Sequence, residues 1–184
     1  MNIIRIGTCV PGQAAEKLLP HLIQAGFECV SLNFHMEFPE KDLSTYWEKV
    51  RPLLEDSPVQ VSSIGFYCHP LENEAQRQTL EHFIDNAHLF GTHLVTTFAG
   101  ALEGQPVEKA MPRYQEVFGE LARRAEANGV RLAIENCPMD GTWNQATCNI
   151  AFNPRAWECM FDAVPSEAIG LEWEPAHQMV QLNA

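Results

Sequence analysis

The stretch Val130-Arg-Leu-Ala-Ile-Glu-Asn-Cys137 decides the fold class. It is a strand-like apolar run that ends in a carboxylate, and it follows an amphipathic helical pattern over residues 107–128. Gly129 lies between the two, at the position that a left-handed residue takes after a helix. A helix that leads through a glycine into a short buried strand is the repeating unit of an α/β protein.

The same unit recurs along the whole chain. Helices of this length between strands predict parallel pairing through right-handed crossovers, and Gly26 and Gly91 mark helix ends as Gly129 does. The pattern predicts strands over 2–10, 27–34, 59–67, 92–98, 130–137 and 168–174, and helices over 14–25, 41–55, 73–90, 107–128 and 153–164.

Two architectures use this unit, an open doubly wound sheet and a closed eight-stranded barrel. Six strands are present, and a barrel needs two more, with about 70 further residues at the usual domain size. Only nine residues follow Pro175. A single domain over 1–184 is expected, and if it is a barrel it lacks the last two β/α units.

Composition and charge exclude several classes of protein. Hydrophobic residues make up 46% of the 184, no apolar run reaches membrane-helix length and the start lacks a signal-peptide pattern, so a soluble cytoplasmic protein is expected. The net charge of −12 argues against nucleic acid and acidic membranes as partners. The six cysteines form no CxxC pair and are expected to be free thiols.

Candidate functional residues follow the strands, because both architectures bind ligands at the carboxyl ends of parallel strands. Glu135 comes directly after a buried run, where a carboxylate needs a partner such as a metal ion. His69 follows the strand over 59–67 and is a candidate ligand or substrate contact, and His35 stays open. Dinucleotide, P-loop and nucleophile-elbow motifs are absent.

The second candidate stretch is Gly170-Leu-Glu-Trp-Glu-Pro-Ala-His177. Alternation assigns Trp173 to the helix layer and turns Glu172 and Glu174 inward, with Glu174 at the mouth of a barrel. His177 is expected in the following loop. Glu172 lies deeper, and Arg131 is its expected partner.

These two stretches, with weaker support from Asn149-Ile-Ala-Phe-Asn-Pro-Arg-Ala-Trp157, resemble the sugar phosphate isomerase/epimerase family of xylose-isomerase-like TIM barrels. The resemblance covers the whole chain and implies the (β/α)₈ fold. It implies that Glu135 and Glu174 hold a divalent metal, with two further ligands beyond Ala184. Glu174 is one methylene longer than the aspartate usual in the family.

The resemblance also implies a function. A metal-dependent isomerase or epimerase would act on a small sugar or keto-sugar (phosphate) through an enediolate, with Mn²⁺, Mg²⁺ or Zn²⁺ as cofactor. Glu135 would be a catalytic acid or base, and His177 and His69 would bind substrate. The 184-residue chain alone is expected to be inactive or nearly so, and open strand edges suggest a homo-oligomer.

Two alternatives stay open. In DNA-repair relatives the histidine matched by His177 binds zinc, so an apurinic-site endonuclease-like zinc hydrolase is one. A non-catalytic barrel fragment is the other. Which sugar is bound is not decided by the loops of one sequence.

Overall fold

The computed structural model describes residues 4–182, and it contains one six-stranded parallel sheet in chain order. The strands are β1 Gly7–Pro11, β2 Cys29–His35, β3 Gln60–Tyr67, β4 Leu94–Thr97, β5 Arg131–Glu135 and β6 Ile169–Glu172. Residues 2 and 3, where the first predicted strand begins, lie outside the described part.

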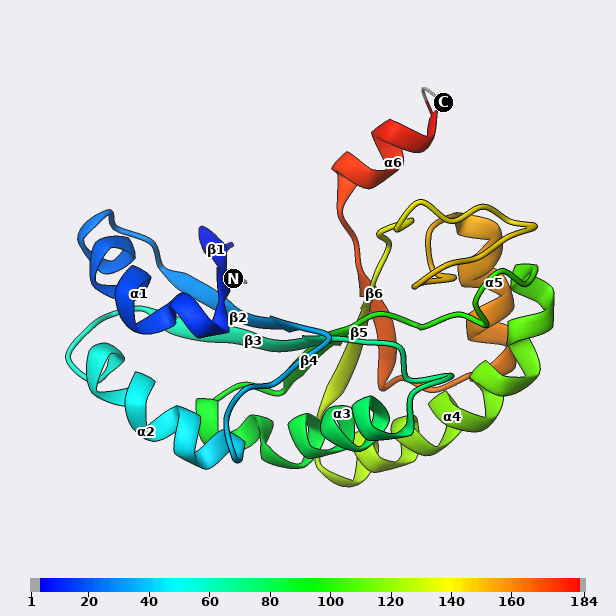
Figure 1. The fold of residues 1–184 in the computed structure, drawn as a ribbon. Helices are drawn as coiled ribbons and strands as arrows, with labels where there is room; N and C mark the ends of the chain where they lie inside the picture. The colour runs from blue at the N-terminus through cyan, green and yellow to red at the C-terminus, as the bar shows by residue number, and fades with distance from the viewer. Residues whose placement is uncertain (1–3, 183–184) are drawn as a thin grey trace.

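Helices connect the strands and lie along the outer side of the curved sheet (Figure 1). They are α1 Ala15–Gln24, α2 Leu43–Leu54, α3 Glu74–Asn86, α4 Val107–Ala127, α5 Pro154–Ala163 and α6 Pro175–Leu182, with 3₁₀ turns η1 Gly12–Ala14 and η2 Ala87–Phe90. Helix α6 differs from the others, because it projects from the carboxyl end of β6 rather than covering the sheet (Figure 1).

The hydrophobic core lies between the sheet and these helices. Strand β2 shows how alternation builds it, because Leu32 and Phe34 belong to the core whereas Ser31 and Asn33 are buried polar residues on the other face. Helix α4 buries an apolar stripe at helical spacing against the sheet. The inner face of the sheet is therefore polar, and its outer face is apolar.

The predicted elements are confirmed, with shorter strands. Strand β1 begins at Gly7 rather than at residue 2, and the third helix ends in a 3₁₀ turn. Gly26, Gly91 and Gly129 all have positive φ, as the helix-end assignment requires. The expected position of His177 is wrong, because this residue lies in the first turn of α6 and not in a loop.

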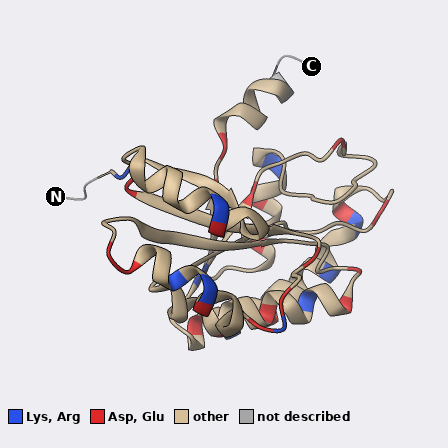
Figure 2. Ribbon diagram, turned by 60° about the vertical axis from the view of Figure 1, so that its left-hand side comes forward, with Lys and Arg blue, Asp and Glu red and all other residues tan. Residues whose placement is uncertain are grey.

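The sheet is open within residues 4–182, because β1 pairs only with β2 and β6 only with β5. Charged residues lie mainly on the helices and loops, while the strands are largely uncharged (Figure 2). Among the described residues, no helix has both the length and the apolar character needed to span a membrane.

Candidate functional site

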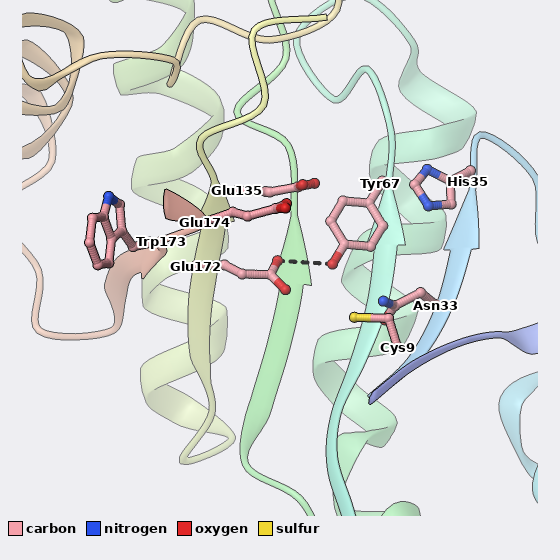
Figure 3. Close-up of a pocket in the computed structure, with 8 residues that line it drawn as sticks. All are labelled: Cys9, Asn33, His35, Tyr67, Glu135, Glu172, Trp173 and Glu174. Carbon is pink, nitrogen blue, oxygen red and sulfur yellow. Dashed lines mark hydrogen bonds between the residues drawn. The ribbon is translucent and has the colours of Figure 1, made fainter. Parts of the chain in front are cut away.

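A cavity of about 370 Å³ opens at the carboxyl ends of the strands (Figure 3). This volume is within the range of small-molecule sites. Its walls come from β1, β2, β3, β5 and β6 and from the two residues after β6. The lining residues are Cys9, Asn33, His35, Tyr67, Glu135, Glu172, Trp173 and Glu174.

A hydrogen-bonded chain crosses the deeper part of the cavity. The Tyr67 hydroxyl donates to Glu172 Oε2 at 2.9 Å (Figure 3). The same hydroxyl accepts a hydrogen bond from Thr96 Oγ1 at 3.0 Å. Burial raises the pKa of Glu172 to about 7; the Tyr67 bond opposes this rise, and the negative charges of Glu135 and Glu174 add to it. Glu172 is thus a carboxyl group that titrates near neutrality.

The prediction that Glu172 pairs with Arg131 is wrong. Glu172 lies level with Glu135 in the β5–β6 register, and Arg131 is four residues earlier on β5. That offset corresponds to roughly 13 Å along a strand, too far for an ion pair. Tyr67, which alternation on β6 could not reveal, takes the place of Arg131.

Gly65 leaves the space in which the side chains of Tyr67, Thr96 and Asn33 meet. A Cβ at Gly65 would lie 2.5 Å from Thr96 Oγ1, 2.6 Å from Asn33 Oδ1 and 2.8 Å from the Tyr67 ring. Side chains cannot approach that closely, so only glycine at this position allows the three groups to meet.

Both candidate metal-binding carboxylates reach the same imidazole at the rim of the cavity. His177 Nε2 lies 3.2 Å from Glu135 Oε1 and 3.0 Å from Glu174 Oε2. Burial raises the pKa of Glu135; the contact with His177 lowers it, and the charge of Glu174 raises it further. The two carboxylates and the imidazole are therefore close enough to bind one ion together.

Asn136 fixes the position of Glu174. This fully buried side chain accepts a hydrogen bond from the Glu174 backbone N–H at 2.6 Å and donates to the Glu174 carbonyl at 3.0 Å. The pair continues the β5–β6 contact past the end of β6 at Glu172. The backbone after β6 is thereby fixed where Glu174 faces the cavity.

Asn149 fixes the other side of the site. Its buried Nδ2 donates to the carbonyls of Glu135 at 2.8 Å and Cys137 at 2.9 Å, and its Oδ1 accepts from the Ala99 and Ala151 amides. Through Asn149, the segment that follows β5 is therefore bound to the loop after β4 and to the end of β5.

The donor set at the rim fits a divalent metal. Glu135, Cys137 and His177 each place one possible ligand atom within 4.8 Å of the others. Carboxylate, imidazole and thiolate groups are all common ligands of transition-metal ions.

The comparisons with known proteins agree with this geometry. The family described as xylose isomerase-like TIM barrel matches residues 20–183. The chain belongs to this family. A search of curated protein sequences gives no significant match.

Solved structures with the same fold include members named as sugar epimerases. An L-ribulose 3-epimerase matches with TM-score 0.71 and 16% identity over 97% of this chain and 63% of its own. The D-allulose 3-epimerase from Methylomonas sp., solved with D-allulose, matches with TM-score 0.73 and 14% identity over 98% and 66%.

A third relative is a xylose isomerase-like TIM barrel protein from Mycobacterium smegmatis in complex with magnesium. It matches with TM-score 0.64 and 18% identity over 91% of this chain and 63% of its own. The chain thus spans less than two thirds of the length of these structures. At these identities the likeness establishes the fold, six β/α units of a (β/α)₈ barrel.

The structure brings together three of the four residues that the family resemblance singled out. Glu135, Glu174 and His177 meet at the rim, whereas His69 does not line the cavity. His69 Nε2 instead lies 3.2 Å from Cys148 Sγ. Its role as a substrate contact stays a prediction.

Trp173 lies on the predicted side of the chain but is not buried. It points away from the carboxylates of Glu172 and Glu174, as alternation predicts (Figure 3), but 59% of its surface is exposed, so it is not buried beneath the helices.

The sequence did not predict five other residues of this site, namely Cys9, Asn33, Tyr67, Cys137 and Asn149. The polar alternation of Ser31, Asn33 and His35 in β2 was a usable signal for an inward polar face. Asn149 carried no such signal, because its partners lie in other segments of the chain.

Proposed function

We propose that this chain is part of a divalent-metal-dependent isomerase or epimerase that acts on a small sugar or keto-sugar through an enediolate. The observation that carries this proposal is the convergence of Glu135 and Glu174 on His177 Nε2 at the rim of a cavity of ligand size. The family membership and the epimerases among the structural relatives support it.

In this proposal Glu135 is the catalytic base. Its partial burial raises its pKa, which makes the ionised carboxylate a stronger base than an exposed glutamate. Glu135 removes the proton from the carbon beside the substrate carbonyl, and return of a proton to the same or the neighbouring carbon completes the reaction. Because His177 Nε2 faces the carboxylates, the other ring nitrogen, Nδ1, would donate a hydrogen bond to a substrate oxygen. A divalent ion, when bound, polarises the carbonyl and stabilises the charge that develops as the proton leaves.

The cavity favours a sugar without a phosphate group. Its described lining contains the three carboxylates of Glu135, Glu172 and Glu174 and no Lys or Arg. The described lining therefore offers no side-chain cation that could pair with a phosphate group. The ring of Tyr67 offers apolar surface for the C–H groups of a sugar.

Deuterium exchange tests the proposal directly. The purified protein is incubated in D₂O with ketopentoses and ketohexoses and with Mn²⁺, Mg²⁺, Co²⁺ or Zn²⁺, and NMR follows loss of the proton next to the carbonyl. This readout detects proton removal even where net turnover is slow. Because the chain alone is expected to be inactive or nearly so in net turnover, we expect slow, metal-dependent exchange that falls at least about 100-fold in Glu135→Gln, the contribution typical of a general base.

Glu167→Gln is the matched control, because Glu167 is exposed and lies before β6, at the opposite end of the strand from the cavity. Its exchange rate should equal that of the wild type. Exchange that is equally fast in Glu135→Gln, or absent for all sugars and ions, would contradict the proposal.

A further inference from the structure

We propose that Cys137 supplies a thiolate to the metal site, which makes this protein select Zn²⁺ or Co²⁺ over Mg²⁺. The inference rests on the divalent-metal site of the proposed function and adds a ligand that neither the family resemblance nor the motif spacing indicated. It begins from the cluster of Glu135, Cys137 and His177, whose possible ligand atoms lie within 4.8 Å of one another.

The distances are already close to those of a metal centre. Bonds of about 2.0–2.3 Å from zinc to oxygen, nitrogen and sulfur place tetrahedral ligand atoms roughly 3.3–3.7 Å apart. The contacts of His177 Nε2 with Glu135 at 3.2 Å and with Glu174 at 3.0 Å are near this spacing without any movement. The Cys137 sulfur needs to approach by little more than about 1 Å at most.

The backbone around the cluster is held in place before any ion binds. Asn149 donates to the carbonyls of both Glu135 and Cys137, which fixes the two residues relative to each other. Asn136 fixes the backbone of Glu174, three residues before His177. A preorganised set of donors loses less conformational freedom when it binds an ion.

Three donors of mixed chemistry then lie around one position, because Glu135 offers oxygen, His177 nitrogen and Cys137 sulfur. Glu174 Oε2 lies 3.0 Å from the same His177 nitrogen. Three protein ligands leave the fourth position of tetrahedral zinc open for a substrate oxygen. Mg²⁺ prefers six oxygen ligands in octahedral geometry, and a thiolate among the ligands disfavours it. As the sulfur–metal bond forms, the thiol releases its proton to solvent, so binding of Zn²⁺ releases a proton that an all-oxygen site would not.

Cobalt spectroscopy provides the test. A Co²⁺–thiolate bond gives a charge-transfer band in the near ultraviolet that oxygen and nitrogen ligands alone do not give. We expect the wild-type protein to develop this band on titration with Co²⁺ and to lose it in Cys137→Ser. Calorimetry should show Zn²⁺ binding weakened by roughly 10- to 100-fold in Cys137→Ser, while the weaker Mg²⁺ binding stays unchanged.

Cys148→Ser is the matched control, because Cys148 is also half-buried and also lies beside a histidine, His69. It should keep both the band and the Zn²⁺ affinity. His177→Gln is a second variant, placed on the projecting helix α6 where a change leaves the sheet intact, and it should weaken Zn²⁺ binding as well.

The outcomes separate this inference from the proposed function. Divalent-ion binding that depends on Glu135 but gives no thiolate band, or a band that persists in Cys137→Ser, overturns the role of Cys137 and leaves the isomerase proposal standing. A band lost only in Cys137→Ser, without deuterium exchange into any sugar, supports the thiolate ligand and removes the isomerase. Failure of every ion to bind overturns both.

Discussion

The titration of Glu172 has a consequence for stability. Its folded-state pKa of about 7 is above the ordinary value of 4.5, so the folded protein holds this proton more tightly than the unfolded chain does. The stability that this proton contributes is fully present below about pH 4.5 and is lost as the pH rises through 7. The metal-free wild-type protein should therefore become less stable across this window.

Glu172→Gln should remove this dependence, because glutamine resembles the protonated acid. We expect the variant to exceed the wild type in stability by on the order of 2 kcal/mol at pH 8 and by little at pH 4.5. Urea unfolding at the two pH values, in the presence of a chelator, measures the difference. Glu167→Gln serves as control, and identical pH dependence in wild type and Glu172→Gln would refute the assignment.

At the residue scale, the sequence predicted the site where a single motif contained it. Glu135, Glu174 and His177 lie in two short stretches, and strand alternation was enough to turn both acids inward. Tyr67 and Cys137 depend on which strands become neighbours and on how the chain leaves β5. Pattern alone does not determine those contacts, and the Arg131 assignment was wrong for the same reason.

The loop after β5 is the element on which the site depends most. Asn149→Ala removes four hydrogen bonds and leaves the carbonyls of Glu135 and Cys137 without this donor in a buried setting. We expect a loss of about 2–4 kcal/mol in the free energy of unfolding, since unsatisfied buried groups keep their desolvation cost. Chemical denaturation of Asn149→Ala measures it.

Asn144→Ala is the control for that loop, because Asn144 is exposed in the same segment and should change stability by little. Equal stability of the two variants would contradict the assigned role of Asn149.

Helix α5 begins where its sequence indicates. Asn153 Oδ1 accepts a hydrogen bond from the Ala156 amide at 3.0 Å, and Pro154 occupies the first turn. Asn153→Ala should cost about 1 kcal/mol of stability, and Asn153→Asp should retain most of it. Thermal unfolding followed by circular dichroism compares the three proteins, and an alanine variant as stable as the wild type would exclude a capping contribution.

At the element scale, the β-α order and the glycine helix ends followed from the sequence, because hydrophobic periodicity and backbone freedom are local properties. The ends of the strands were predicted less well. The last residues of 130–137 and 168–174 have a strand-like sequence pattern, but there the Asn136 side chain, and not a ladder of backbone hydrogen bonds, makes the contact. Helix α6 was missed because its eight residues, Pro175–Leu182, give too little periodicity.

The whole molecule presents two strand edges that lack a partner within residues 4–182, at β1 and β6. Apolar side chains with more than half of their surface exposed accompany them, among them Ile6, Trp173 and Val180. Exposed edges and apolar surface favour association. We expect light scattering to give a mass above the 20.7 kDa of one chain, increasing with protein concentration. A constant monomer mass would count against the predicted homo-oligomer.

The missing side chain at Gly65 also defines how deep a ligand can go. Because Thr96, Asn33 and Tyr67 occupy the space where a methyl group would stand, their side chains cover Gly65, and two of them, Asn33 and Tyr67, line the cavity. Replacing one hydrogen atom of Gly65 by a methyl or hydroxymethyl group would push these side chains toward the cavity and make it shallower. Selection between longer and shorter carbon skeletons could thus be adjusted at a single codon, away from the groups that perform the proton transfer.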